Sequence, residues 1–141
     1  MKDFLRKISL ILFLLILCSP INSSAEWTKV GATKDVTLYL DPSKTASPDS
    51  VTKRAAVLLS YTSKQQVDKS SPYFSILSQL ETDCQKMTYK IVTNIYYSAQ
   101  MGRGNIVDTS NIPPQEQEVR SPVKDSVLGD VIAYVCSKNM H

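Results

Sequence analysis

The sequence predicts an α+β domain, in which an antiparallel sheet of five to six strands carries a C-terminal helix on one face, tied by a disulfide. Three observations support this fold class. Apolar residues recur at every second position from Trp27 to about Val107. In the tail they recur at every fourth position. Two cysteines, Cys84 and Cys136, connect the strand-like part of the chain to the helix-like part.

Residues 1–25 are predicted to be a secretory signal peptide. Lys2, Arg6 and Lys7 precede the apolar run Ile8–Leu17, and small residues lead to a cleavage point after Ala25. The folded domain is therefore expected to span residues 26–141. We expect an exported protein that is periplasmic, secreted or on the outer surface.

Export also predicts how the three cysteines are used. Secreted chains keep cysteines mainly as disulfides. Cys18 lies at the end of the signal peptide and would leave with it, so Cys84 and Cys136 are the only possible pair. A lipid anchor on Cys18 is an alternative, but the bulky Leu17 before it favours ordinary cleavage after Ala25.

Six segments are predicted as strands because they alternate apolar and polar residues or are rich in β-branched and aromatic residues. They are Trp27–Val30, Val36–Leu40, Thr52–Tyr61, Tyr73–Thr82, Cys84–Ser98 and a short strand starting at Ile106-Val107. Tyr73–Thr82 also fits a helical period, so a helix is an alternative there. Cys84–Ser98 is the strongest strand, with Cys84 at its head.

Turn-forming residues separate these segments. The predicted connections are a turn at Gly31, a turn at Asp41-Pro42, a loop at Ser43–Ser50, a mobile loop at Lys64–Pro72, a turn at Gly102–Asn105 and an extended connector at Asn111–Glu118.

The tail is predicted to form a helix of about four turns. Ser121 supplies an N-cap and Pro122 suits the first helical position. Valines then recur every fourth residue from Val123 to Val135. Val131–Val135 alone could also form a buried strand.

Charge and hydropathy exclude two classes of partner. The net charge of +3 falls to about +1 once the three basic residues and one acidic residue of the signal peptide are removed. Basic residues form no block, so nucleic-acid binding has no electrostatic support. After Leu17 no apolar stretch reaches the roughly twenty residues of a transmembrane helix.

The inventory of reactive side chains predicts a protein without catalytic activity, cofactor or metal. The one histidine, His141, is the last residue, and the paired cysteines leave no thiol. No Gly-x-Ser-x-Gly elbow is present. Asp41, Glu81 and Asp83 lie near strand ends, but nothing in the sequence brings two of them together.

A binding surface is easier to support. In the strand from Met87 to Tyr97, Lys90, Val92 and Tyr96 are predicted to share the face opposite Tyr89 and Ile91. One helix can cover only one face of a sheet, and exposed tyrosines favour protein contacts. We therefore predict that Lys90, Val92 and Tyr96 belong to a face that binds a protein partner or forms a homodimer.

Several features occur in an order that resembles the surface-adhesin protein E family of Gram-negative bacteria. They are Trp27, Asp41-Pro42-Ser43, Ser78, Asp83-Cys84, the strand Met87–Tyr97, Met101-Gly102, Pro122 with Ser126, and Val135-Cys136. The resemblance covers nearly all of residues 26–141. It departs at Gln115–Arg120, where such proteins commonly carry a second tryptophan.

The resemblance implies a six-stranded antiparallel sheet with a helix held by a disulfide. It also implies adhesion, because the best-known member of the family binds matrix and serum proteins such as laminin, vitronectin and plasminogen. We therefore expect an exported, non-enzymatic binding domain that engages host or envelope macromolecules. The alternative is a periplasmic structural or small-ligand-binding protein with no adhesive role.

Overall fold

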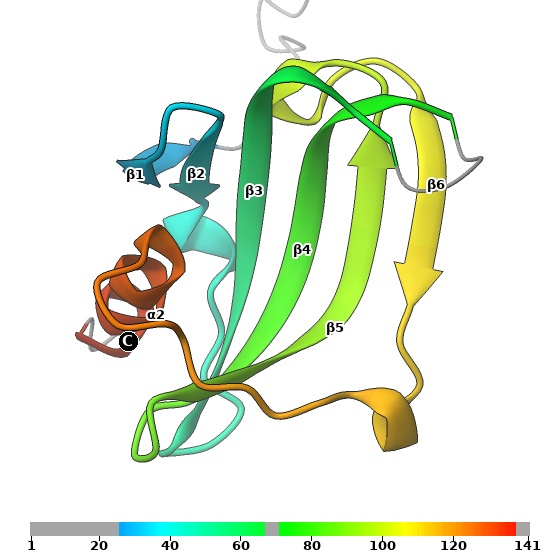
Figure 1. Ribbon diagram of the computed structural model, residues 1–141. Coiled ribbons are helices and arrows are strands. Elements are labelled where there is room, and N and C mark those ends of the chain that lie inside the picture. The colour runs from blue at the N-terminus through cyan, green and yellow to red at the C-terminus, as the bar shows by residue number, and fades with distance from the viewer. Residues whose placement is uncertain (1–25, 67–70, 138–141) are drawn as a thin grey trace, which may run out of the picture.

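The computed structural model describes residues 26–66 and 71–137 (Figure 1). The predicted signal peptide, Cys18, residues 67–70 of the predicted loop and His141 lie outside these ranges. Six strands form one antiparallel sheet in chain order: β1 (Thr28–Ala32), β2 (Val36–Leu40), β3 (Thr52–Gln65), β4 (Tyr73–Asp83), β5 (Thr88–Tyr97) and β6 (Ile106–Asn111). The predicted fold class is confirmed, and Tyr73–Thr82 belongs to a strand rather than a helix.

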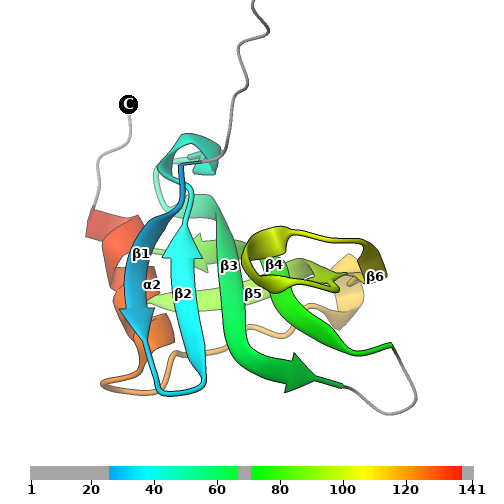
Figure 2. The same ribbon diagram turned by 90° about the horizontal axis from the view of Figure 1, so that it is seen from above.

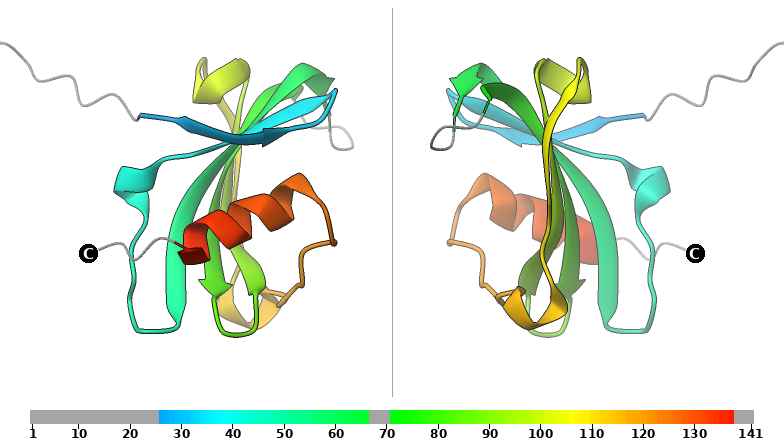
Figure 3. Two further views of the ribbon diagram at one scale, coloured as in Figure 1. Left: turned by 90° about the vertical axis from the view of Figure 1, so that its left-hand side faces the viewer. Right: turned by 90° about the vertical axis from the view of Figure 1, so that its right-hand side faces the viewer.

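The helix α2 (Val127–Ser137) packs on one face of this sheet. Figures 2 and 3 show that the β1–β2 hairpin turns away from the longer strands and that α2 lies in the resulting corner. Val131, Ile132 and Val135 are fully buried there. They pack against a cluster that includes Leu38, Leu40, Ala55, Val57 and Leu80. We call this side the helix face and the opposite side the outer face.

The predicted disulfide between Cys84 and Cys136 is confirmed, with Cα atoms 5.4 Å apart. It ties α2 to the connection between β4 and β5. The prediction that Cys84 stands at the head of the strand Cys84–Ser98 is wrong, because β5 begins only at Thr88. Asp83 explains the difference: its Oδ1 accepts hydrogen bonds from the backbone N–H groups of Gln85 and Lys86, which turns the chain.

The helix begins five residues later than predicted from Pro122. Ser126 is the capping residue, since its Oγ accepts a hydrogen bond from the N–H of Gly129 at 3.1 Å. Asp125 has a positive φ of 57°, which no helical residue adopts. Val123 is consequently outside the helix and 76% exposed, so the buried stripe begins at Val127.

A contact between distant segments holds the connector extended just before this region. Arg120 pairs with Tyr89 at the edge of β5 through two backbone hydrogen bonds of 2.8 Å. The connector is thus extended at this point, as predicted, although Pro114–Glu116 forms one 3₁₀ turn, η3.

Gly31 lies within β1, not in the predicted turn. The pairing of β1 with β2 shifts between Lys29 and Gly31, and α2 approaches closely at this bulge. A Cβ atom on Gly31 would lie 2.5 Å from Cγ1 of Val127. The absence of a side chain here therefore lets the start of α2 reach the sheet.

The upper half of the outer face is covered by the 3₁₀ turn η2 (Gln100–Gly102). The buried hydroxyl of Ser75 donates to the carbonyl of Ala99 at 2.6 Å and accepts from the N–H of Gly102 at 2.9 Å. Ser60 accepts from the N–H of Met101 at 3.2 Å. This cover buries Leu58 completely and leaves the lower half of the outer face open.

Candidate binding surface on the outer face

A groove of about 490 Å³ lies on the open part of the outer face. It crosses β3, β4 and β5, and small side chains make it hollow. Ala56 follows Arg54 and precedes Leu58 on the same side of β3. Ala46 adds a further small residue, because its backbone pairs with Arg54 and extends the sheet beyond β3. Val92 closes the far end on β5.

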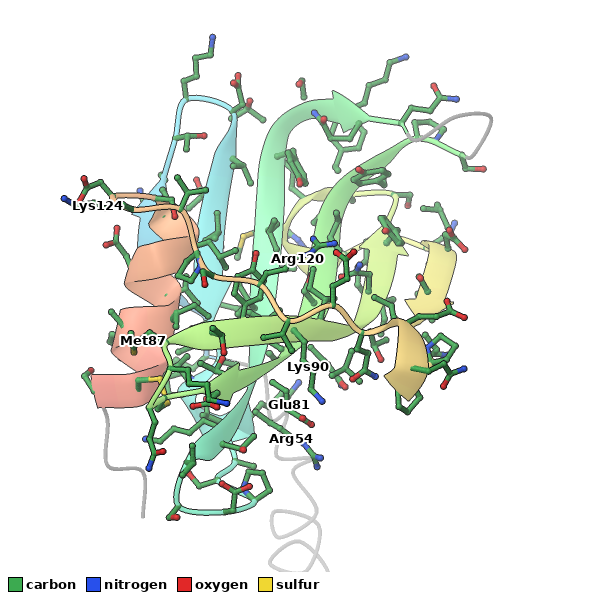
Figure 4. The ribbon with its side chains drawn as sticks, turned by 60° about the horizontal axis from the view of Figure 1, so that its bottom comes forward. Arg54, Glu81, Met87, Lys90, Arg120 and Lys124 are labelled. Atoms are coloured by element: carbon green, nitrogen blue, oxygen red, sulfur yellow. A yellow bond between two sulfur atoms is a disulfide. The ribbon has the colours of Figure 1, made fainter. Side chains whose placement is uncertain are left out.

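A cluster of three charged side chains borders the groove. Arg54, Glu81 and Lys90 stand directly opposite one another on β3, β4 and β5 (Figure 4). Nε of Arg54 donates to Oε2 of Glu81 at 3.0 Å, and Nζ of Lys90 lies 2.9 Å from Oε1. Opposite charges on neighbouring strands stabilise the pairing of a sheet.

The two cations keep Glu81 ionised. The hydrogen bond from Lys90 is the main reason that the pKa of Glu81 lies below its ordinary value; Arg54 acts in the same direction, and burial opposes both. The side chain of Glu81 is only 17% exposed, whereas that of Arg54 is 62% exposed. Glu81 therefore holds Arg54 in place while much of the guanidinium stays in contact with solvent.

Lys44 adds a third cation to the groove. Its Nζ lies 3.9 Å from Oδ2 of Asp41, and its side chain is 56% exposed. Asp41 itself is completely buried, and its Oδ1 accepts hydrogen bonds from the backbone N–H and the hydroxyl of Ser43. These bonds cap the 3₁₀ turn η1 (Pro42–Lys44), which positions Lys44.

A smaller hollow of about 240 Å³ lies on the other side of the cluster and is also lined by Glu81 and Lys90. Its wall includes Asp83 and Lys86, which form an ion pair at 3.9 Å, and the exposed Val119. The cluster is therefore a charged ridge between two hollows.

Comparison with known proteins identifies the family. The family described as surface-adhesin protein E matches residues 27–137. This chain belongs to that family. Comparison with curated proteins gives no match.

Solved structures of Haemophilus influenzae protein E share the fold. Crystal form II of Haemophilus influenzae protein E superposes with a TM-score of 0.61 at 12% identity, covering 84% of this chain and 92% of that chain. A second structure of Haemophilus influenzae protein E gives 0.59 at 14% identity, covering 85% and 90%. Protein E from non-typeable Haemophilus influenzae gives 0.59 at 14% identity, covering 84% and 80%. At such identities the similarity shows the fold alone.

The structure brings together only part of the predicted binding face. Lys90 and Val92 are brought together beside the groove. Tyr96 is not, because it stands opposite Ile76, on the helix face. The register shifts between Gln79 and Leu80, where β5 carries Val92 as an extra residue, so the alternation of faces reverses along β5.

Tyr96 belongs instead to an aromatic cluster. Its ring lies 5.0 Å from that of Tyr73, which lies 6.0 Å from that of Tyr61, and both contacts are edge-to-face. Burial is the main cause that raises the pKa of both Tyr61 and Tyr73. These phenols therefore stay neutral at physiological pH and contribute packing area.

The groove residues Arg54, Lys44 and Ala56 were absent from the predicted binding face. Arg54 had one sequence signal, its place in the same alternation as Ala56 and Leu58. Within residues 26–66 and 71–137, no group of three His, Cys, Asp or Glu side chains is placed to hold a metal ion. In the same part of the chain, no helix is long and apolar enough to cross a membrane.

Proposed function

We propose that this chain is an exported, non-enzymatic binding domain that engages a protein of the cell envelope or of a host matrix through the outer-face groove. The observation that carries the proposal is the charged cluster of Arg54, Glu81 and Lys90 beside an apolar hollow on an open sheet face. Binding interfaces commonly combine an apolar centre with a polar rim and favour arginine.

The arrangement of the two faces supports this choice of surface. On the helix face, α2 covers the apolar residues of β2 and β3. On the outer face, η2 covers Leu58 and leaves a groove that is bordered by Gln79 and Val92, with the largely buried Ala56 at its floor. Membership of the adhesin family is consistent with a binding role.

The states of the acidic residues support a non-enzymatic role. Glu81 is neutralised by two cations, and Asp41 is buried against Ser43. A general base needs a carboxylate that can reach a substrate and take up a proton. Neither residue is arranged in that way.

Export is supported by the charged, apolar and small-residue order of residues 1–25. The disulfide agrees with an oxidising compartment. Protease treatment of intact cells tests the location: degradation of the protein supports the outer surface, and protection of the protein supports the periplasm.

The binding proposal is tested by capture of proteins from envelope and matrix extracts on the immobilised, oxidised domain. Arg54→Ala should reduce capture, because it removes the most exposed of the three cations at the groove. Lys34→Ala is the matched control, since Lys34 is an exposed lysine in the turn between β1 and β2. Equal capture by both variants would exclude the groove as the binding site.

The groove also suits a second function, binding of a small ligand in the periplasm. Its volume of about 490 Å³ falls within the range of roughly 300–1,000 Å³ that is usual for ligand pockets. Mass spectrometry of the native protein from periplasmic extract would reveal a retained small molecule in that case.

A further inference from the structure

We propose that the groove takes a side-chain carboxylate from an extended acidic segment of the partner protein, with a neighbouring aliphatic side chain of that segment seated on the groove floor. This inference rests on the proposed function and specifies the chemistry of the partner. Three properties of the groove support it: the free end of Arg54, the balance of charge and the apolar floor.

Arg54 provides two adjacent hydrogen-bond donor groups, the terminal amino groups of its guanidinium. Among the described residues, the hydrogen bond that holds its side chain uses Nε, bonded to Oε2 of Glu81. The two terminal amino groups remain for a ligand, and together they match the two oxygens of a carboxylate. Because Glu81 orients the guanidinium beforehand, less side-chain entropy is lost on binding.

The charges around the groove are balanced. Lys44, Arg54 and Lys90 are the three cations, and Glu81 and Asp41 are the two carboxylates that they contact. Asp49 is a third carboxylate, which lies close enough to Arg54 to interact with it electrostatically, so the groove holds no run of unpaired cations. A sulfated glycan or a nucleic acid presents many anionic groups and needs a run of unpaired cations instead.

The neighbouring charges follow the same pattern. Lys86 and Asp83, in the smaller hollow, are paired with each other at 3.9 Å. They add no net charge to the surface. A segment of alternating acidic and aliphatic residues therefore fits this face better than a polyanion.

The floor of the groove accepts an aliphatic side chain. Ala46, Ala56 and Val92 line it and offer no side-chain hydrogen bond, while the exposed Gln79, opposite Ala56 on β4, adds one polar side chain. The groove crosses three strands that lie about 4.8 Å apart. An extended segment can therefore place its carboxylate on Arg54 and an aliphatic side chain over Ala56.

The test uses a short blocked peptide with a central glutamate between valines, titrated into the ¹⁵N-labelled, oxidised domain of residues 26–141. We expect shifts of the Arg54 Nε–Hε signal and of the Val92 amide signal. The same peptide with glutamine in place of glutamate should bind at least about tenfold more weakly, because it loses a charge-assisted hydrogen bond.

Three variants separate the contribution of the positive charge at position 54, that of the paired terminal donors of Arg54 and that of the apolar groove floor. Arg54→Lys keeps the positive charge but removes the two adjacent N–H donor groups of the guanidinium, so peptide binding should weaken. Ala56→Leu fills the floor without a change of charge and should block the peptide. Lys34→Ala should bind like the wild type. Unchanged thermal midpoints show that each variant is folded.

Equal binding of the glutamate and glutamine peptides, or shifts only outside the groove, would overturn the inference. Binding of a heparin oligosaccharide in preference to the peptide would also overturn it, in favour of a polyanion. The proposed function has its own test. If the wild type and Arg54→Ala capture proteins from the extracts equally, the proposed function is wrong, independently of the result with the peptides.

Discussion

Removal of the disulfide should cost this domain a large part of its stability. The perturbation is the double variant Cys84→Ala/Cys136→Ala, which leaves no cysteine in residues 26–141. The bond connects residues separated by 52 positions. In the chain-entropy relation, a loop of this length corresponds to about 4 kcal/mol of destabilisation of the unfolded state. A typical domain has about 5–15 kcal/mol in total.

The fold gives a reason to expect that the domain still forms without the bond. Val131, Ile132 and Val135 remain completely buried under the sheet, and burial of each is worth about 1.5–3 kcal/mol. The helix should therefore stay docked in the folded variant. Loss of the disulfide should therefore lower the free energy of unfolding without changing the fold.

Urea unfolding followed by circular dichroism measures this effect. The oxidised wild type and the double variant are compared at the same pH, and the variant should also show a larger m-value because its unfolded chain is less compact. Val131→Ala in both backgrounds is the control. If the disulfide acts only on the unfolded chain, the destabilisation caused by Val131→Ala should be equal in the wild type and in the double cysteine variant.

A loss below about 1 kcal/mol would refute the reasoning, since it would mean that the bond barely restricts the unfolded chain. A cost of Val131→Ala that differs strongly between the backgrounds would show that the bond itself positions α2.

Three further predictions concern single positions. Gly31→Ala should destabilise the domain by about 1–3 kcal/mol through its clash with Val127, and Val127→Ala should relieve part of that cost in a double-mutant cycle followed by urea unfolding. Glu81 has a lowered pKa when folded, so its contribution is complete above pH 4.5 and is lost as the pH falls through the folded value; Glu81→Gln should flatten this part of the dependence of the urea midpoint on pH. Ser75→Ala leaves the N–H of Gly102 without its buried acceptor and should cost about 1–3 kcal/mol, with faster amide exchange in η2 as the specific signature.

Local patterns in the sequence predict most of the sheet. Alternation over Thr52–Tyr61 and Tyr73–Thr82 predicts these two strands residue by residue, although consecutive residues of β3 from Ala55 to Leu58 are buried on both faces of the sheet. The pairing of Cys84 with Cys136 also follows from counting, once Cys18 is assigned to the signal peptide. These features need no knowledge of distant contacts.

The misplaced features depend on contacts between distant segments. Arg120 pairs with Tyr89, 31 positions away, and the residues that follow it stay outside α2, which is capped by Ser126 instead. Tyr96 changes face because of a bulge at Val92, and period-two alternation does not detect one extra residue.

The candidate site could be predicted only in part, for the same reason. Lys90 and Val92 belong to one strand and were found from its alternation. Ala46 reaches the groove because the loop that contains it returns to pair with Arg54 on β3.

Photo-crosslinking tests the central claim, that the outer-face groove contacts a protein partner. A photoreactive residue is placed at Gln79, which is exposed on β4 and lines the groove, and in a second variant at Lys34, far along the chain. Both variants are expressed in the native cell and irradiated. We predict a crosslinked protein adduct from position 79 that is absent from position 34. An adduct from position 34 with none from position 79 would contradict the claim.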